Sequence, residues 1–284
     1  MNKQDIKIPC ADGFELIGTL YEPTVSKAAI MIAPATGIKR QFYNSFATHL
    51  AENGYGVICF DNRGIGGSTD GSINDVDASL INWGRLDMPA VLKKLQATFP
   101  NQSHHLIGHS AGGQLLGLMD NSPEINSMFN FACSSGSLRN MPYPFKFTAA
   151  FYLNVFLPVS NLLFGKTNSQ WMGMGEPIPK RVAVEWNRWC NGAGYVATDF
   201  GKEIKEHHYH KLELPSMWLY ATDDGIANLA NVNDMTRVYT KSKIEILALD
   251  PKELGLKQLG HMGFFSSKNK KVWKHAIEWL QSHE

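Results

Sequence analysis

Cysteine is scarce in this sequence, and its first residues lack a long apolar run. The 284 residues include four widely spaced cysteines, Cys10, Cys59, Cys133 and Cys190, which form no C-x-x-C pair. This spacing indicates reduced thiols in a cytosolic protein. The N-terminal stretch MNKQDIKIPCADG is polar and lacks the apolar segment of a signal peptide. We therefore expect a cytoplasmic location.

An excess of charge of either sign is also missing. The sequence holds 27 basic and 26 acidic residues, a formal net charge of +1, and no long basic stretch. This balance indicates neither a nucleic-acid partner nor attraction to an anionic membrane surface. Hydrophobic residues make up 44% of the chain. That share is enough for a sizeable core, in one large domain or in one domain with an insertion.

Only one apolar run calls for comparison with a membrane span. It covers residues 147–164, FTAAFYLNVFLPVSNLLF. A span needs about 20 mostly apolar residues, and this run is interrupted by Asn154, Pro158, Ser160 and Asn161. We therefore expect a buried helix or a lid helix, and no stable membrane span.

Apolar strands alternate with helical patterns along most of the chain. Residues 6–23 predict an antiparallel hairpin. Continuous apolar runs predict buried strands, at 28–34, 56–60, 104–110, 129–135, 216–222 and 243–249. Pro89 predicts that one helix starts near Asp87, with Asp87 as its cap. The alternation favours an α/β fold with a mostly parallel, twisted sheet and helices on both faces.

This alternation breaks in a segment rich in aromatic residues and proline. We assign residues 1–136 and 206–284 to the core and residues 137–205 to a helical cap insertion, called the cap segment below. Most of its large apolar side chains are expected to pack between cap and sheet, and a minority to line an apolar pocket. They are Phe147, Phe151, Tyr152, Phe156, Leu162, Leu163, Phe164, Trp171, Met172, Met174, Trp186 and Trp189.

Ser110 has the sequence context of a catalytic nucleophile. The stretch Gly108-His109-Ser110-Ala111-Gly112 fits G-x-S-x-G between an apolar strand and a helix. The serine of such an elbow occupies a strained turn, so the positions two residues away must carry almost no side chain. The turn places the hydroxyl near the helix N-terminus, where the N–H of Ala111 is free to hold an oxyanion. A glycine-rich turn without chemistry is the alternative interpretation.

A serine nucleophile needs a base, and the base needs an acid that orients it. In this fold the expected chain order is Ser, then Asp or Glu, then His. Asp223 and Asp224 end a predicted strand; we prefer Asp224 as the acid, with Asp223 as a turn former and the alternative acid. His261 is the only histidine in the loop before the C-terminal helix and is the predicted base. His109, inside the elbow, is predicted to be a packing residue.

Three neighbouring histidines, His207, His208 and His210, suggest a metal site at first sight. No coherent strand-end carboxylate accompanies them, so a polar surface loop is the preferred interpretation.

These motifs resemble the α/β-hydrolase superfamily, and within it the branch of bacterial hydrolases similar to serine aminopeptidases and monoacylglycerol lipases. GHSAGG (108–113) is similar to the elbow of that branch. FDNRGIGGS (60–68) resembles the D-x-R-G-x-G-x-S loop after the fourth strand, and MIAPATG (31–37) takes the place of the H-G-x oxyanion loop. The resemblance implies that residues 137–205 are the variable lid or cap of the family.

The resemblance also implies a role for each site residue. Ser110 would be the nucleophile, His261 the base and Asp224 the orienting acid, with the backbone N–H groups of Thr36 and Ala111 as the oxyanion hole. One departure is that Pro34-Ala35 replaces the usual His-Gly of the oxyanion loop. Proline has no N–H and fixes its own φ, so either Ala35 or Thr36 supplies the first amide.

The predicted reaction is hydrolysis of a carboxylic ester, or a related acyl bond, through an acyl-enzyme intermediate. The expected partner is a small, apolar acyl substrate, and the chemistry needs no metal or organic cofactor. A thioesterase, an amidase and an acyltransferase with the same triad are the alternatives. A non-catalytic binding protein would be expected to lack one member of the triad.

Overall fold

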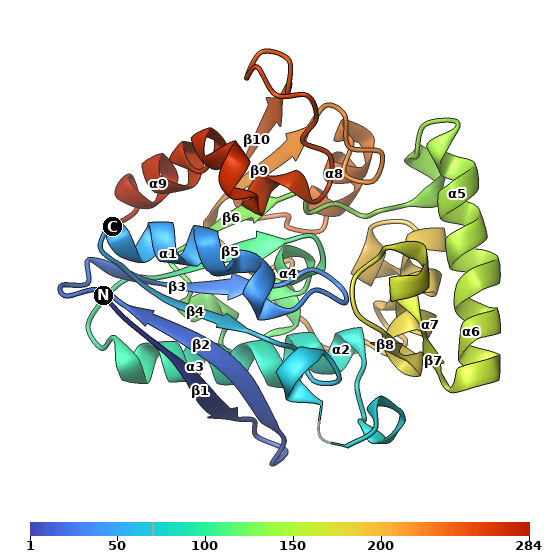
Figure 1. The fold of residues 1–284 in the computed structure, drawn as a ribbon, viewed down its shortest axis with the longest axis horizontal. Coiled ribbons are helices and arrows are strands. Elements are labelled where there is room, and N and C mark those ends of the chain that lie inside the picture. Colours follow the sequence, from blue (N-terminus) through green and yellow to red (C-terminus); the bar gives the residue numbers. More distant parts are fainter. Residues whose placement is uncertain (70) are drawn as a thin grey trace.

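An eight-stranded, mostly parallel sheet forms the centre of the molecule (Figure 1). The computed structural model describes residues 1–69 and 71–284. The strand order is β1-β2-β4-β3-β5-β6-β9-β10. The strands are β1 Asn2–Pro9, β2 Glu15–Glu22, β3 Ala28–Ala33, β4 Tyr55–Phe60, β5 His104–His109, β6 Ser127–Phe131, β9 Pro215–Ala221 and β10 Lys243–Leu249. β2 pairs antiparallel with β1 and β4, and the remaining pairs are parallel. The predicted fold class is confirmed.

Helices cover both faces of this sheet. The helices outside the cap segment are α1 Asn44–Glu52, α2 Leu80–Asn82, α3 Met88–Thr98, α4 Ala111–Gln114, α8 Leu229–Thr236 and α9 Lys274–Gln281. α1 and α9 share one face, because the ring of Phe46 lies 5.6 Å from that of Phe131, and the ring of Trp279 lies 6.3 Å from that of Phe129. Side chains alternate along a strand, so Met128 of β6 points to the opposite face.

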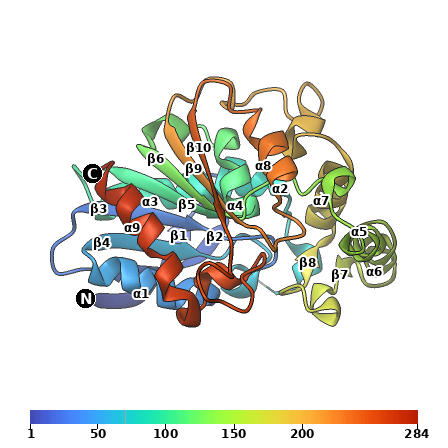
Figure 2. The same cartoon turned by 90° about the horizontal axis from the view of Figure 1, so that it is seen from above.

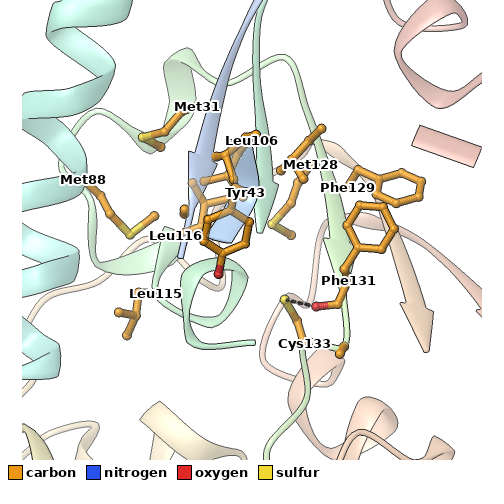
Figure 3. Close-up of a cluster of buried hydrophobic side chains, with 14 of the residues drawn as sticks. Met31, Tyr43, Met88, Leu106, Leu115, Leu116, Met128, Phe129, Phe131 and Cys133 are labelled. Atoms are coloured by element: carbon orange, nitrogen blue, oxygen red, sulfur yellow. Dashed lines mark hydrogen bonds between the residues drawn. The ribbon is translucent and has the colours of Figure 1, made fainter. Parts of the chain in front are cut away.

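The core beneath α3 is made of interlocking thioether and aliphatic side chains. Figure 3 shows Met31, Leu106 and Met128, from three neighbouring strands, on the same side of the sheet as Met88 of α3. All four side chains are buried. This core packs against β5, which pairs with β3 and β6 and is directly followed by Ser110.

Two helices each contain one wide π-helical turn that ends two positions before a proline. The turns are Trp83–Asp87, before Pro89, and Tyr152–Phe156, before Pro158. Proline lacks an N–H and its ring crowds the carbonyl four residues earlier, so a wider turn lets the helix continue. The predicted position is confirmed, since α3 begins at Met88, but the wide turn joins it to α2 and the predicted capping role of Asp87 is wrong. Asp87 has helical φ/ψ and makes no capping hydrogen bond; its buried carboxylate pairs with Arg63 instead.

The cap segment lies beyond the carboxyl ends of the parallel strands (Figures 1 and 2). It contains α5 Phe145–Phe151, α6 Leu157–Phe164 and α7 Lys180–Asn191, with the antiparallel pair β7 Lys166–Thr167 and β8 Ile178–Pro179. The exact boundaries at 137 and 205 stay a prediction.

One continuous helix, Phe145–Phe164, forms the outer edge of the cap segment (Figure 2). Among the described residues it is the one helix long and apolar enough to cross a membrane, judged by length and composition. Most of this helix is not buried, since only 28% of its most apolar 18-residue stretch lies inside the protein. A single outer helix has protein on one side only. The expected inward packing is wrong for seven cap side chains, which are exposed: Phe147, Phe151, Leu162, Leu163, Phe164, Trp171 and Met172.

Candidate active site

Ser110 lies directly after β5 in a strained turn. Its φ of 49° and ψ of −118° are rare for a residue with a side chain. A Cβ added to Gly112 would overlap the carbonyl of Ala33, and one added to Gly108 would overlap the backbone of Gly113. The glycines around the serine are therefore required by the close approach of neighbouring backbone. The predicted helix after the serine is short, since α4 has four residues.

Ser110, His261 and Asp224 come together at the carboxyl edge of the sheet. His261 Nε2 lies 3.1 Å from Ser110 Oγ, and His261 Nδ1 lies 2.8 Å from Asp224 Oδ2. Asp224 Oδ1 accepts the N–H groups of Ile226 and Ala227 at 2.7 and 3.0 Å. Because these two amides hold one carboxylate oxygen, the other oxygen is fixed against the imidazole.

The environment of Asp224 favours its charged form. The side chain is 1% exposed, and burial by itself raises the pKa. The attraction of His261 and the hydrogen bonds from His261, Ala227 and Ile226 outweigh burial, so the pKa of Asp224 lies below its ordinary value. A carboxylate in this position keeps the proton of the imidazole on Nδ1 and leaves Nε2 free to accept a proton from the serine.

Asp223 contacts the histidine loop in a different way. Its Oδ2 accepts the N–H of Leu259 at 2.9 Å, and its Oδ1 accepts the N–H of Gly260 at 2.8 Å. Gly260 directly precedes His261 in the chain. Asp223 therefore holds the backbone of the loop, whereas Asp224 faces the imidazole.

His109 connects the elbow to two other loops. It is fully buried, its Nδ1 lies 2.8 Å from Tyr43 Oη, and its Nε2 lies 3.1 Å from the carbonyl oxygen of His261. A carbonyl only accepts, so Nε2 donates to it and Nδ1 accepts from the tyrosine hydroxyl. Burial and the nearby His261 lower the pKa of His109 to about 3, which keeps the ring neutral. His109 is thus a hydrogen-bonded positioning residue as well as a packing residue.

The amides of Ala35 and Thr36, in the oxyanion loop, differ in whether they are already hydrogen-bonded within the protein. The N–H of Ala35 donates to Tyr43 Oη at 2.9 Å. Thr36 borders the same cavity as Ser110, and its N–H makes no hydrogen bond to any residue in the described part of the chain. Of Ala35 and Thr36, the two candidates from the sequence, Thr36 therefore has the amide that is left for a ligand.

The cavity above Ser110 is mostly apolar. Its volume is about 370 Å³, within the range of small-molecule sites. Thr36, Ser110 and His261 are among its polar lining residues. Most of the remaining wall comes from the cap segment, including Phe145, Ala149, Tyr152, Leu153, Met172, Met174 and Trp186. The described residues that line it include no aspartate or glutamate.

Tyr195 is a polar residue of this wall that the sequence did not indicate. Its side chain is 1% exposed and its backbone has a φ of 53°, a strained value for a bulky residue. The hydroxyl lies beside the side chain of Thr36. By geometry, it has no hydrogen-bond partner in the described part of the chain. Burial raises the pKa of Tyr195 well above its ordinary value, so the hydroxyl keeps its proton. No motif surrounds Tyr195 in the sequence, so only the fold identifies it.

Other polar residues singled out from the sequence have structural contacts. Arg63 is buried and donates to Asp87 and Asp12. The ring of His207 stacks on Phe200 with 3.9 Å between centroids. Within residues 1–69 and 71–284, no three His, Cys, Asp or Glu side chains come close enough to share a metal ion.

Comparison with known proteins assigns the chain to a family. Residues 24–249 match the family model described as serine aminopeptidase, S33. No curated protein sequence matches the chain.

Three solved structures show the same fold over nearly the full chain. A soluble variant of monoglyceride lipase from Saccharomyces cerevisiae, in complex with a substrate analog, has a TM-score of 0.69 and 14% identity, covering 100% of this chain and 95% of that one. An esterase of Pyrococcus furiosus has a TM-score of 0.63 and 14% identity, covering 99% and 91%. An esterase domain from Rhodothermus marinus has a TM-score of 0.61 and 18% identity, covering 100% and 99%. Since the family model spans more than half of its length, the chain belongs to the serine aminopeptidase S33 family and is an α/β hydrolase.

Proposed function

We propose that this hydrolase cleaves a carboxylic ester with an apolar acyl group, through an acyl-enzyme formed on Ser110. The observation that carries the proposal is the chain of hydrogen bonds from Ser110 Oγ through His261 to Asp224, beside an apolar cavity. Ser110 Oγ attacks the ester carbonyl while His261 Nε2 accepts the hydroxyl proton, and Asp224 stabilises the resulting imidazolium. His261 then returns the proton to the leaving alcohol. A water molecule, deprotonated by His261, releases the acid and restores the serine.

The oxyanion would be held by the backbone N–H groups of Thr36 and Ala111. Support for Thr36 comes from its place in the cavity wall and from the engagement of the Ala35 amide by Tyr43. Ala111 directly follows the nucleophile, the usual position for the second donor. Losing one such donor reduces turnover by about 10² to 10³ in comparable hydrolases.

The cavity wall favours a neutral ester over the substrate that the family name suggests. An aminopeptidase must accommodate the ammonium group of a free N-terminus, and a buried cation needs a partner of opposite charge. The described lining residues offer no carboxylate. Their apolar side chains suit an acyl chain instead.

The cytoplasmic location is part of the same proposal. All four cysteines are free and buried, which supports a protein that works without disulfides.

Labelling with a fluorophosphonate probe tests the nucleophile. The wild-type protein should be labelled and Ser110→Ala should not, because the probe phosphonylates only an activated serine. Circular dichroism of the variant provides the control for folding. A folded wild-type protein that stays unlabelled would overturn the proposal. A panel of chromogenic esters of increasing acyl length should then show rising kcat/KM, and added alcohols would reveal any acyl transfer.

A further inference from the structure

The outer side of the Phe145–Phe164 helix carries a continuous row of apolar side chains, called the cap ridge below. Its members follow helical spacing and have exposed fractions between 47 and 83%: Phe147, Phe151, Val155, Val159 and Leu162. At one end the ridge continues through Leu163 and Phe164 to Trp171, whose ring lies 5.2 Å from that of Phe164. Contiguous apolar surface of this kind marks a place where a soluble fold meets a partner or a lipid phase.

The inner side of the same helix belongs to the folded protein. The buried hydroxyl of Tyr152 donates to Ser169 at 2.9 Å, and Asn161 accepts from Thr167 at 2.8 Å. Ala149 and Leu153 line the catalytic cavity. A helix that crossed a bilayer would lose these contacts. A helix that lies in the plane of the interface keeps them and buries only its outer side.

Part of the cavity wall reaches the protein surface next to the ridge. Phe145 and Met172 border the cavity and are also 37 and 39% exposed. Phe145 precedes Phe147, the first ridge residue, by two positions, and Met172 follows Trp171 directly. A ligand that leaves a surface covered by the ridge would therefore reach the cavity without crossing bulk water.

Charge identifies the kind of surface. No aspartate or glutamate occurs between Glu124 and Glu176, whereas Arg139, Lys146 and Lys166 do. The near-neutral balance of the whole chain hides this local excess of positive charge. The acidic residues Asp75 and Asp77 lie near the Phe164 end of the helix, where the side chain of Asn74 donates to the carbonyl of Phe164. Arg139 and Lys146 leave the Phe147 end positively charged. Anionic headgroups supply the missing counter-charge, and tryptophan and lysine beside an apolar row are typical of interfacial helices.

We propose that the cap ridge docks on an anionic lipid surface, with its helix lying in the headgroup plane and the catalytic cavity behind it. The purpose of this docking, access to esters dissolved in the lipid, rests on the proposed function. The docking itself requires no turnover, so the two proposals fail separately.

Vesicle flotation with the full chain tests the docking. The wild-type protein should float with vesicles of phosphatidylcholine mixed with phosphatidylglycerol, less with phosphatidylcholine alone, and less again at high salt. Phe151→Ser combined with Leu162→Ser should reduce the partition coefficient on the order of 100-fold. The matched control combines Val25→Ser with Leu229→Ser, two exposed apolar residues outside the cap segment, and should bind as wild type does. Turnover of a short, water-soluble ester should be unchanged in both variants.

Three outcomes would overturn the docking proposal. One is a wild-type protein that floats with neither kind of vesicle while it hydrolyses the soluble ester. Another is equal flotation of the ridge variant and the control variant. The third is a wild-type dimer, seen by analytical ultracentrifugation, that the ridge variant loses, because the ridge would then be an interface between copies. Absence of ester turnover with intact flotation would instead contradict the proposed function.

Discussion

Replacing Asp224 by asparagine should leave the fold intact and reverse the tautomer of His261. In the wild type, one carboxylate oxygen accepts the amides of Ile226 and Ala227, and the other faces His261 Nδ1. Both amides are donors, so the carbonyl oxygen of the asparagine must face the amides of Ile226 and Ala227. Its NH₂ group must then face His261 Nδ1. An NH₂ group donates, which forces Nδ1 to accept and places the ring proton on Nε2, opposite Ser110.

A histidine with its proton on Nε2 cannot take the proton of the serine. Turnover should therefore fall by about 10⁴-fold, the loss found in a serine protease when the orienting aspartate becomes asparagine. Asp223→Asn is the matched control. It removes one of two acceptors for the loop backbone, a loss of about 1 kcal/mol, so turnover should fall by less than about tenfold. Initial rates with a chromogenic ester measure both variants, and ¹⁵N NMR reports the tautomer of His261.

Two results would refute this reasoning. If Asp224→Asn kept turnover within about tenfold of wild type, the hydrogen-bonded carboxylate would have no part in orienting the base. If Asp223→Asn caused the larger loss while the protein stayed folded, the acid would be Asp223.

Two further predictions concern a cavity residue and a core residue. Tyr195→Phe removes a buried hydroxyl that lacks a partner among the described residues, so denaturant titration should show the free energy of unfolding rising by about 1 kcal/mol. A lower free energy of unfolding would contradict this interpretation. Burial lowers the pKa of His105 to about 4, and its ring bonds the hydroxyls of Ser103 and Ser127. As pH falls from about 6.5 to about 4, the unfolded chain binds a proton there that the folded chain does not, so denaturant titrations should show wild type losing up to about 1.4 kcal/mol per pH unit relative to His105→Gln. Parallel pH profiles of the two proteins would exclude this contribution.

The central strands could be predicted from the sequence because they are buried on both faces. A strand covered on both faces is a continuous apolar run, as in β3 and β4, whose residues are all buried. The order of the site residues followed from the same strands, since each candidate comes after a predicted strand. Asp223 and Asp224 could not be separated in this way, because adjacent residues in a turn point in different directions. Only the folded turn shows that Asp224 meets the ring and Asp223 meets the loop backbone.

The cap segment resisted prediction for a different reason. Periodicity identifies one side of a helix only when the other side is polar. The Phe145–Phe164 helix is apolar around most of its circumference, so its sequence does not distinguish the side that lines the cavity from the side that faces outward. Its continuity across Pro158 depends on a π turn, which no residue pattern in the sequence indicates. The same limitation affected Pro89, because the sequence predicted a capped helix start near Asp87 and did not indicate the wide turn that joins α3 to α2.

The hydrogen bonds of His109 explain how this chain tolerates Pro34-Ala35 in the oxyanion loop. A flexible loop at this position would cost catalysis, because oxyanion donors act through their fixed placement. Here the N–H of Ala35 binds Tyr43, the hydroxyl of Tyr43 binds His109, and His109 binds the backbone carbonyl of His261. The imidazole of His109, within the elbow, therefore connects the oxyanion loop to the loop that carries His261. Since the low pKa of His109 keeps that ring neutral down to about pH 3, the connection should persist wherever the fold does.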